Sequence, residues 1–195
     1  MSTLKSHIKS LGPDEIRGSL ISWAKKYLSH DESDTFISEL CFVDRARRAD
    51  LVLANGSLSA FEIKSEKDDL SRWAGQQVDY LSCFENVWLC VHAKHIESAL
   101  QNTHKSIGLL LVDNLSSISM VREAGLNFSL EAYNLTGFLW RADLDKLAKK
   151  HGVETKSRMR IKEVREILST ELPLDIIKSF ALKTLKARYS SSSSV

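Results

Sequence analysis

The sequence lacks any apolar run near the roughly 20 residues that a membrane-spanning helix needs. Its first residues, Met1 to His7, also lack the apolar segment of a secretion signal. Cysteine is scarce, with three residues that all lie in apolar segments: Cys41, Cys83 and Cys90. These absences predict a cytoplasmic protein without a membrane partner, whose three thiols stay reduced in the core.

Common catalytic motifs are absent as well. The six histidines form no HExxH zinc site, and the chain has no glycine-rich phosphate-binding loop. The segment Cys90-Val91-His92-Ala93-Lys94-His95 offers metal-ligating residue types, but its cysteine lies in an apolar stretch and no fourth ligand follows at a useful spacing. We therefore do not expect a zinc site.

Charge is distributed unevenly along the 195 residues. From Thr136 onward the chain carries 13 Lys and Arg against 7 Asp and Glu, whereas the first 135 residues carry 14 against 18. A basic C-terminal part favours contact with a polyanion such as DNA. Basic helix faces that are only solvated are the alternative.

Hydrophobic periodicity divides the first 121 residues into helices and strands. Helices are predicted over residues 13–29, 68–84 and 96–102. Strands are predicted over residues 87–91, 107–112 and 115–121, the last at a sheet edge, with a hairpin between Asp50 and Lys64. Residues 35–43 are predicted as a strand or a helix end that carries Glu39. This order predicts an α/β fold, a mixed central sheet flanked by helices.

From Thr136 the pattern becomes helical. Three amphipathic helices are expected, around residues 140–151, 161–168 and 173–188, and the basic connector 154–160 joins the first two. This part loosely resembles a SAP-type DNA-binding hairpin, and a helical cap on the sheet is an equal alternative. The predicted organisation is a core over 1–135, a helical extension over 136–189 and a disordered tail over 190–195.

The most informative feature is a set of charged residues at the ends of two adjacent strands. Two apolar-rich stretches meet at Asn55-Gly56, and Asp50, Glu62 and Lys64 lie at their far ends. Burying two acids and a lysine there is costly unless they bind something, and a divalent metal beside a phosphodiester is the leading candidate. The alternative is an exposed sheet edge with a surface ion pair worth about 0–1 kcal/mol.

The spacing of Asp50, Glu62 and Lys64 resembles the motif of the PD-(D/E)XK nuclease superfamily, with Ala49 in place of the proline. Glu39 upstream and the pair Gln76 and Tyr80 downstream extend the resemblance, which is strongest over residues 36–92 and is greatest to small stand-alone bacterial members. It implies a restriction-endonuclease-like α-β-β-β-α-β core and a Mg²⁺- or Mn²⁺-dependent DNA nuclease.

The resemblance also implies individual roles. Catalysis would fall to Asp50, Glu62, Lys64 and Gln76, with Tyr80 in support. The metal would be held by Asp50, Glu62, the Ile63 carbonyl and Glu39. Glu39 is otherwise a solvent-facing carboxylate, and Gln76 and Tyr80 are otherwise helix-packing groups. The candidate nucleic-acid contacts, which are otherwise solubilising surface residues, are Arg48, Arg72, Lys156, Arg158 and Arg160.

The hairpin makes a geometric demand on this site. Side chains alternate along a strand, so Glu62 and Lys64 share one face. A two-residue Asn55-Gly56 loop would place Asp50 on the opposite face, whereas a three-residue loop that includes Ser57 brings Asp50 opposite Glu62. We therefore expect an odd-length turn or a bulge.

Three functions remain open. The chain is a metal-dependent DNA nuclease, a nuclease-like protein that binds DNA without cutting it, or a protein-interaction subunit of a larger complex. Because all four acid and lysine positions of the superfamily are filled, at Glu39, Asp50, Glu62 and Lys64, the nuclease is favoured. Cutting both strands of a duplex would need a homodimer or two successive events.

Overall fold

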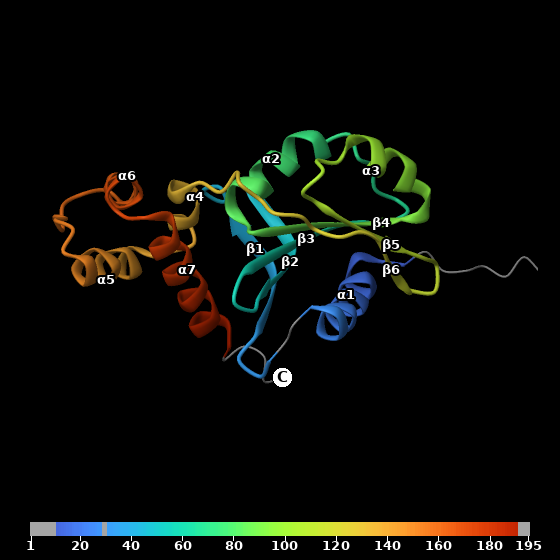
Figure 1. Ribbon diagram of the computed structural model, residues 1–195, viewed down its shortest axis with the longest axis horizontal. Helices are drawn as coiled ribbons and strands as arrows, with labels where there is room; N and C mark the ends of the chain where they lie inside the picture. The colour runs from blue at the N-terminus through green and yellow to red at the C-terminus, as the bar shows by residue number, and fades with distance from the viewer. Residues whose placement is uncertain (1–10, 29–30, 191–195) are drawn as a thin grey trace, which may run out of the picture.

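A computed structural model describes residues 11–28 and 31–190 and shows a mixed six-stranded sheet with helices on both faces (Figure 1). The strands lie side by side in chain order: β1 (Thr35–Phe42), β2 (Arg47–Ala54), β3 (Leu58–Lys64), β4 (Asn86–His92), β5 (Gly108–Val112) and β6 (Ile118–Arg122). The first three strands are antiparallel, β3 to β5 are parallel, and β6 returns antiparallel to β5. The α/β class and the mixed sheet are thus confirmed.

Helices cover both faces because parallel strands need crossover connections. Helix α1 (Pro13–Tyr27) lies on one face, while α2 (Trp73–Cys83) and α3 (Ile96–Asn102) lie on the other, as Figure 1 shows. A short 3₁₀ turn, η1 (Ala93–His95), precedes α3. The β3–α2–β4 and β4–α3–β5 units place Glu62 and Lys64 on a central strand under α2.

Three expectations about local structure need correction. Helix α2 begins at Trp73 rather than at residue 68, because the carboxylates of Asp68 and Asp69 accept hydrogen bonds from Ser65 and Ser71 and hold this stretch as turns. Strand β6 begins at Ile118 rather than at residue 115, because a turn precedes it in which the Asp113 carboxylate accepts two backbone N–H groups.

The third correction concerns cysteine. Cys83 and Cys90 are buried, and burial raises the pKa of their thiols to about 11 and about 12. Cys41, in contrast, is exposed, because it lies on the edge strand β1 between the buried Leu40 and Phe42. Only two of the three cysteines are therefore core residues.

The sheet separates two apolar clusters. One lies beneath α1 and joins its buried face to odd-numbered residues of β2 and β3, among them Leu51 and Phe61. The other lies beneath α2 and includes Val52 and Ala60, and it continues into the C-terminal helices. The hairpin strands are thus buried on both faces, so the charged residues at their ends are next to the core.

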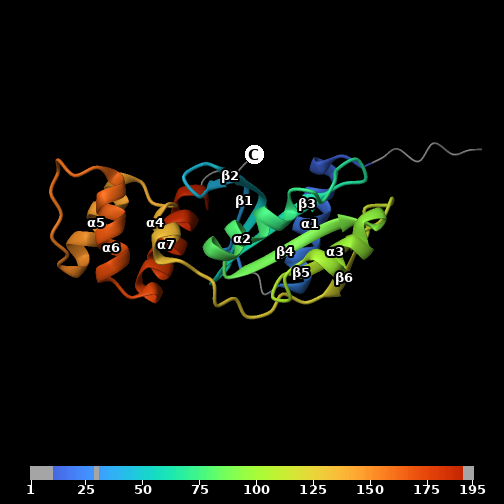
Figure 2. The ribbon, with the colours of Figure 1, turned by 90° about the horizontal axis from the view of Figure 1, so that it is seen from above.

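The C-terminal part forms a helical group beyond strand β1, as Figure 2 shows from above. It comprises α4 (Ala132–Thr136), α5 (Arg141–His151), α6 (Ile161–Glu171) and α7 (Leu174–Tyr189). Helix α5 ends at Gly152, whose left-handed φ of 69° suits glycine. Helix α7 packs on β1 and β2, and ion pairs join Lys186 to Asp34 and Lys178 to Glu85. The extension therefore shares a core with the sheet.

Two further expectations concern the chain ends and membranes. Of the tail expected over 190–195, Ser190 caps α7, and the rest lies outside the described residues, as does the N-terminal segment 1–10. Within the described ranges, no helix has the length and apolarity to cross a membrane.

Candidate active site at the ends of strands β2 and β3

The turn of the hairpin has the odd length that the site requires. Ala54 pairs with Leu58, which leaves a three-residue loop of Asn55, Gly56 and Ser57. Gly56 has a φ of 92°, a conformation that a glycine adopts without steric cost. The prediction of an odd-length turn is therefore confirmed, and this register brings Asp50 opposite Glu62.

Strands β2 and β3 separate just where the charged residues lie. Their last paired residues before the charged ends are Leu51 and Phe61. Beyond them, the Asp50 Oδ2 atom accepts a hydrogen bond of 2.7 Å from the backbone N–H of Ile63. The side chain of Asp50 takes the place of a backbone partner, and this fixes its carboxylate between the two strands.

Glu62 and Lys64 form a buried pair on the face that α2 covers. Lys64 Nζ donates a hydrogen bond of 2.7 Å to Glu62 Oε1. Glu62 is only 5 % exposed and Lys64 only 8 %. Lys64 also donates to Gln76 Oε1 at 3.2 Å, and the Tyr80 hydroxyl donates to Glu62 Oε2. Gln76 and Tyr80 lie one turn apart on α2, and both contact the pair.

Electrostatics distinguish Asp50 from an ordinary surface acid. Burial, followed by the negative charge of Glu62, raises the pKa of Asp50 to about 6, and the Ile63 hydrogen bond only partly opposes this. Burial and the same Glu62 charge raise the pKa of the Tyr80 hydroxyl well above its ordinary value. Two carboxylates thus repel one another in a partly desolvated site, where an added positive charge would be stabilising.

Glu39 lies on β1 beside Asp50 of β2, and its carboxylate pairs with two arginines. It has a left-handed φ of 58°, between the pairs Ser38–Leu51 and Leu40–Ala49 of strands β1 and β2. Its carboxylate receives Arg17 at one oxygen and Arg48 at the other, both at 2.5 Å. Its charge still raises the pKa of Asp50. The structure therefore places Glu39 at the site, with both oxygens engaged.

Arg17 is a site residue that the sequence did not reveal. From α1 it donates through Nε to the Asp50 backbone carbonyl at 3.1 Å, besides its bonds to Glu39 and to Asp14. It thereby joins α1, β1 and β2 at the point where Asp50 no longer pairs with strand β3. Its partners lie 22 and 33 residues away along the chain, so periodicity within α1 carries no signal for this role.

The predicted nucleic-acid contacts do not gather at one place. Arg48 is at the site, paired with Glu39, and Arg72 is exposed just before α2. The other three are exposed on the connector between α5 and α6, in the helical extension: Lys156, Arg158 and Arg160.

No metal cluster of the usual kind is formed by residues 11–28 and 31–190, where no three His, Cys, Asp or Glu side chains are grouped to hold an ion. Besides burial, the charges of Glu62 and, less strongly, of Glu39 both raise the pKa of Asp50. Mg²⁺ keeps several waters and is commonly held through one or two carboxylates, so this donor set is compatible with it.

The fold and this site define an α/β protein with two coupled carboxylates and a lysine at a strand end. Residues 9–195 match the family described as Bacteriophage P4 protein cII, and the chain belongs to that family. Protein cII of Enterobacteria phage P4 is 31% identical over 187 residues, covering 94% of this chain and 70% of the relative. A solved protein of unknown function from Silicibacter pomeroyi is 18% identical, covers 76% of this chain and 99% of its own, and has a TM-score of 0.46.

Proposed function

We propose that the protein is a metal-dependent phosphodiester hydrolase, a DNA nuclease of the PD-(D/E)XK type that acts in the cytoplasm. The observation that carries this proposal is the convergence of Asp50, Glu62 and Lys64 through an odd-length turn. The order α1-β1-β2-β3-α2-β4 supports it, because it matches the element order of the restriction-endonuclease-like core. The buried state of the lysine–glutamate pair also supports it, since the cost of desolvating two charged groups largely offsets their attraction and leaves such a pair with little net effect on stability.

Asp50 and Glu62, with the Ile63 carbonyl, would hold Mg²⁺ or Mn²⁺, and Glu39 is the further acid within reach of their charge. When bound, such an ion neutralises charge on the phosphate and makes a bound water more acidic. The raised pKa of Asp50 supports this assignment, because burial and the nearby charge of Glu62 both disfavour the ionised carboxylate, and a bound cation would stabilise it.

The protein's own groups would orient the reactants. The Lys64 ammonium has three protons and donates to Glu62 and Gln76, so one donor remains to bind a phosphate oxygen or the attacking water. Gln76 holds Lys64 in place from α2, and the Tyr80 hydroxyl holds the second oxygen of Glu62. These bonds preorganise the charged groups before a substrate arrives, which is the largest contribution that proteins make to such reactions.

A second candidate is a protein of the same fold that binds DNA without cutting it. Both oxygens of Glu62 and both oxygens of Glu39 already have protein partners, and this observation favours the second candidate. A protein-interaction subunit is the third candidate.

Cleavage of plasmid and single-stranded DNA in Mg²⁺ or Mn²⁺ separates the three. If the protein is a nuclease, the wild type cuts DNA and the variants Asp50→Ala and Lys64→Ala lose this activity. DNA affinity without cleavage in any metal moves the assignment to the non-cleaving protein. Neither cleavage nor affinity points to the interaction subunit.

A further inference from the structure

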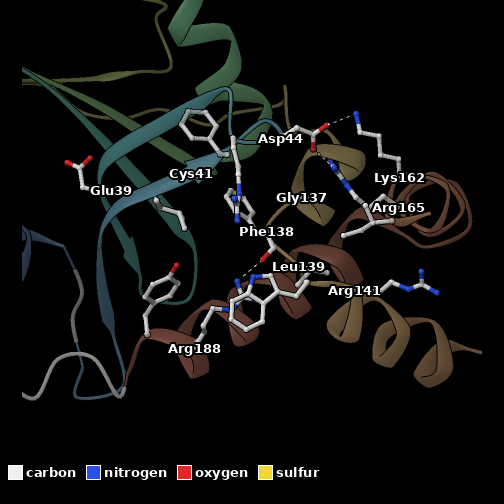
Figure 3. Close-up of a pocket in the computed structure, with 16 residues that line it drawn as sticks. Glu39, Cys41, Asp44, Gly137, Phe138, Leu139, Arg141, Lys162, Arg165 and Arg188 are labelled. Carbon is white, nitrogen blue, oxygen red and sulfur yellow. Dashed lines mark hydrogen bonds and ion pairs between the residues drawn. The ribbon is translucent and has the colours of Figure 1, made fainter. Parts of the chain in front are cut away.

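A cleft of about 640 Å³ separates the β1–β2 hairpin from the helical extension (Figure 3). Its sheet wall runs from Glu39 to the turn at Asp44 and Arg45, and its opposite wall includes Trp140 and Lys162. Because Glu39 lies between the pairs Ser38–Leu51 and Leu40–Ala49, and so beside Asp50 on β2, this end of the cleft adjoins the candidate active site. A chain that leaves the active site along β1 would therefore enter the cleft.

The charged residues that line the cleft are mostly cationic. Two acids contribute, Glu39 and Asp44, and both are engaged: Glu39 by two arginines outside the cleft, and Asp44 by Arg165 and Lys162. The five cationic residues of the lining are Arg45, Arg141, Lys162, Arg165 and Arg188. Arg141 and Arg188 pair with Asp145 and Asp143 outside the lining, and Arg45 has no acid partner among the described residues. The lining itself still carries more cations than acids, which is complementary to a phosphodiester backbone.

Arg45 is held in a backbone conformation that suits glycine better. Its φ is 68°, and the two residues before it, Val43 and Asp44, also have positive φ values of 46° and 51°. Each such residue costs of order 1–3 kcal/mol. Within the described part of the chain, Arg45 forms no hydrogen bond or ion pair that would offset this cost. The Arg45 guanidinium lines the cleft and is therefore available to bind a phosphate group.

Trp140 supplies an aromatic surface at the opposite wall. It is 63 % exposed, whereas Trp23, Trp73 and Trp88 are buried. The Arg188 guanidinium lies 3.9 Å from its ring centroid and covers one face of the indole. The large exposure that remains leaves indole surface for another planar group. Bases in a duplex are already stacked, so an indole of this kind favours a single strand.

Arg141 orders the basic connector that continues from this wall. It donates to the carbonyls of Met159 at 2.5 Å and of Lys156 at 3.2 Å, and to Asp145 at 2.9 Å. These bonds tie the connector to α5 and direct it into α6, where Lys162 lines the cleft. The exposed cations of the connector thus extend the cationic surface of the cleft.

We propose that this cleft binds a single-stranded segment of DNA adjacent to the phosphate that is cut. A base stacks on Trp140, and Arg45 and Lys162 contact phosphates. The direction of the strand toward Asp50 rests on the proposed nuclease function, whereas binding in the cleft does not depend on cleavage.

The test measures binding of a 20-nucleotide oligo-dT to the full-length protein in EDTA, so that no metal-dependent cleavage occurs. Trp140 is the single exposed tryptophan among the four in the chain, so oligo-dT should quench a red-shifted emission that Trp140→Phe lacks. Trp140→Ala should weaken binding about 5- to 150-fold. The pair Arg45→Gln and Lys162→Gln should reduce the slope of log K against log salt by about 1.4, or roughly 0.7 per lost phosphate contact.

Two matched controls lie elsewhere on the surface. Lys105→Gln removes an exposed lysine near α3, and Phe128→Ala removes an exposed aromatic residue before α4. Both should bind as the wild type does. Unchanged affinity in the cleft variants, or equal losses in the controls, would overturn the proposal. Equal or tighter binding of a blunt duplex, or tighter binding of oligo-U, would also overturn it.

The outcomes separate this proposal from the nuclease assignment. If binding depends on the cleft residues but no cleavage occurs in Mg²⁺ or Mn²⁺, the proposed DNA-binding cleft stands and the nuclease assignment is wrong. If the protein cleaves DNA but Trp140→Ala and the charge variants bind oligo-dT as the wild type does, the nuclease assignment stands and the proposed DNA-binding cleft is wrong.

Discussion

The carboxylate of Asp50 accepts a hydrogen bond from the backbone N–H of Ile63 at 2.7 Å, at the point where strands β2 and β3 stop pairing. A side chain here replaces a strand as the partner of a backbone group. This arrangement fixes the carboxylate of Asp50 between the two strands, where burial and the charge of Glu62 raise its pKa. The site therefore depends on a local separation of strands β2 and β3.

The first prediction concerns the stability cost of Asp50. With a folded pKa of about 6 against an ordinary 3.8, the folded protein loses stability as the pH rises from about 4 to about 6, and this loss remains at higher pH. Asp50→Asn should therefore raise the free energy of unfolding by about 1–3 kcal/mol at pH 8 and change it little near pH 4. Urea unfolding in EDTA measures this. Asp69→Asn is the control, because the pKa of Asp69 is lowered rather than raised.

The second prediction compares the two arginines that bind Glu39. Arg17 is largely buried, whereas the Arg48 side chain is 66% exposed. A double-mutant cycle of Arg17→Met with Glu39→Gln should give a coupling free energy of about 1–3 kcal/mol. The same cycle with Arg48→Met should give at most about 1 kcal/mol, because solvent screens exposed pairs. Equal coupling free energies, measured by thermal or urea unfolding, would show that burial of Arg17 does not strengthen its interaction with Glu39.

The third prediction concerns the Tyr80 hydroxyl. Tyr80→Phe removes a buried hydrogen bond to the Glu62 carboxylate and should lower the free energy of unfolding by about 1.5–3 kcal/mol. If Glu62 needs this bond for its position, DNA cleavage should fall as well. Tyr133→Phe is the control, since its hydroxyl makes no hydrogen bond within the described residues. A loss in Tyr133→Phe of the same size would contradict the assignment.

The fourth prediction concerns the attachment of the helical extension. Arg165, only 4 % exposed, donates to Asp44, to Thr136 and to the Tyr133 carbonyl. Arg165→Met should lower the free energy of unfolding by about 3–5 kcal/mol. Lys162→Met removes an exposed partner of the same Asp44 and should cost at most about 1 kcal/mol.

Acid titration tests the same attachment. The Arg165 hydrogen bond is the largest cause that lowers the pKa of Asp44, so the stability it provides is present above pH 3.8 and is lost as the pH falls below that value. The difference between the wild type and Arg165→Met, measured by urea unfolding, should therefore narrow in acid. A constant difference down to about pH 2 would contradict this account.

Local patterns in the sequence predicted much of the fold. Helix α3 has the bounds expected from its apolar spacing, and the period of two placed Glu62 and Lys64 on one face. The turn at Asn55-Gly56 could be assigned an odd length because only that register brings Asp50 opposite Glu62. In each case the deciding forces act between residues close together in sequence.

Long-range contacts could not be predicted in this way. Arg17 meets Glu39, and Arg165 meets Asp44 across 121 residues, and neither pairing leaves a periodic signal. The start of α2 was missed because the side chain of Asp68 competes for backbone N–H groups. Cys41 was expected in the core because its neighbours are apolar, yet its strand lies at the sheet edge.

The central claim is that Glu62 belongs to a metal-dependent nuclease site. Its most direct test is the single-turnover cleavage rate of an end-labelled DNA strand in Mn²⁺, for the wild type, Glu62→Gln and the control Glu66→Gln, an exposed acid just beyond β3. We predict a loss on the order of 100-fold or more for Glu62→Gln and a rate within about twofold of the wild type for Glu66→Gln. Equal rates in all three proteins, or no cleavage by the wild type in Mg²⁺ or Mn²⁺, would contradict the assignment.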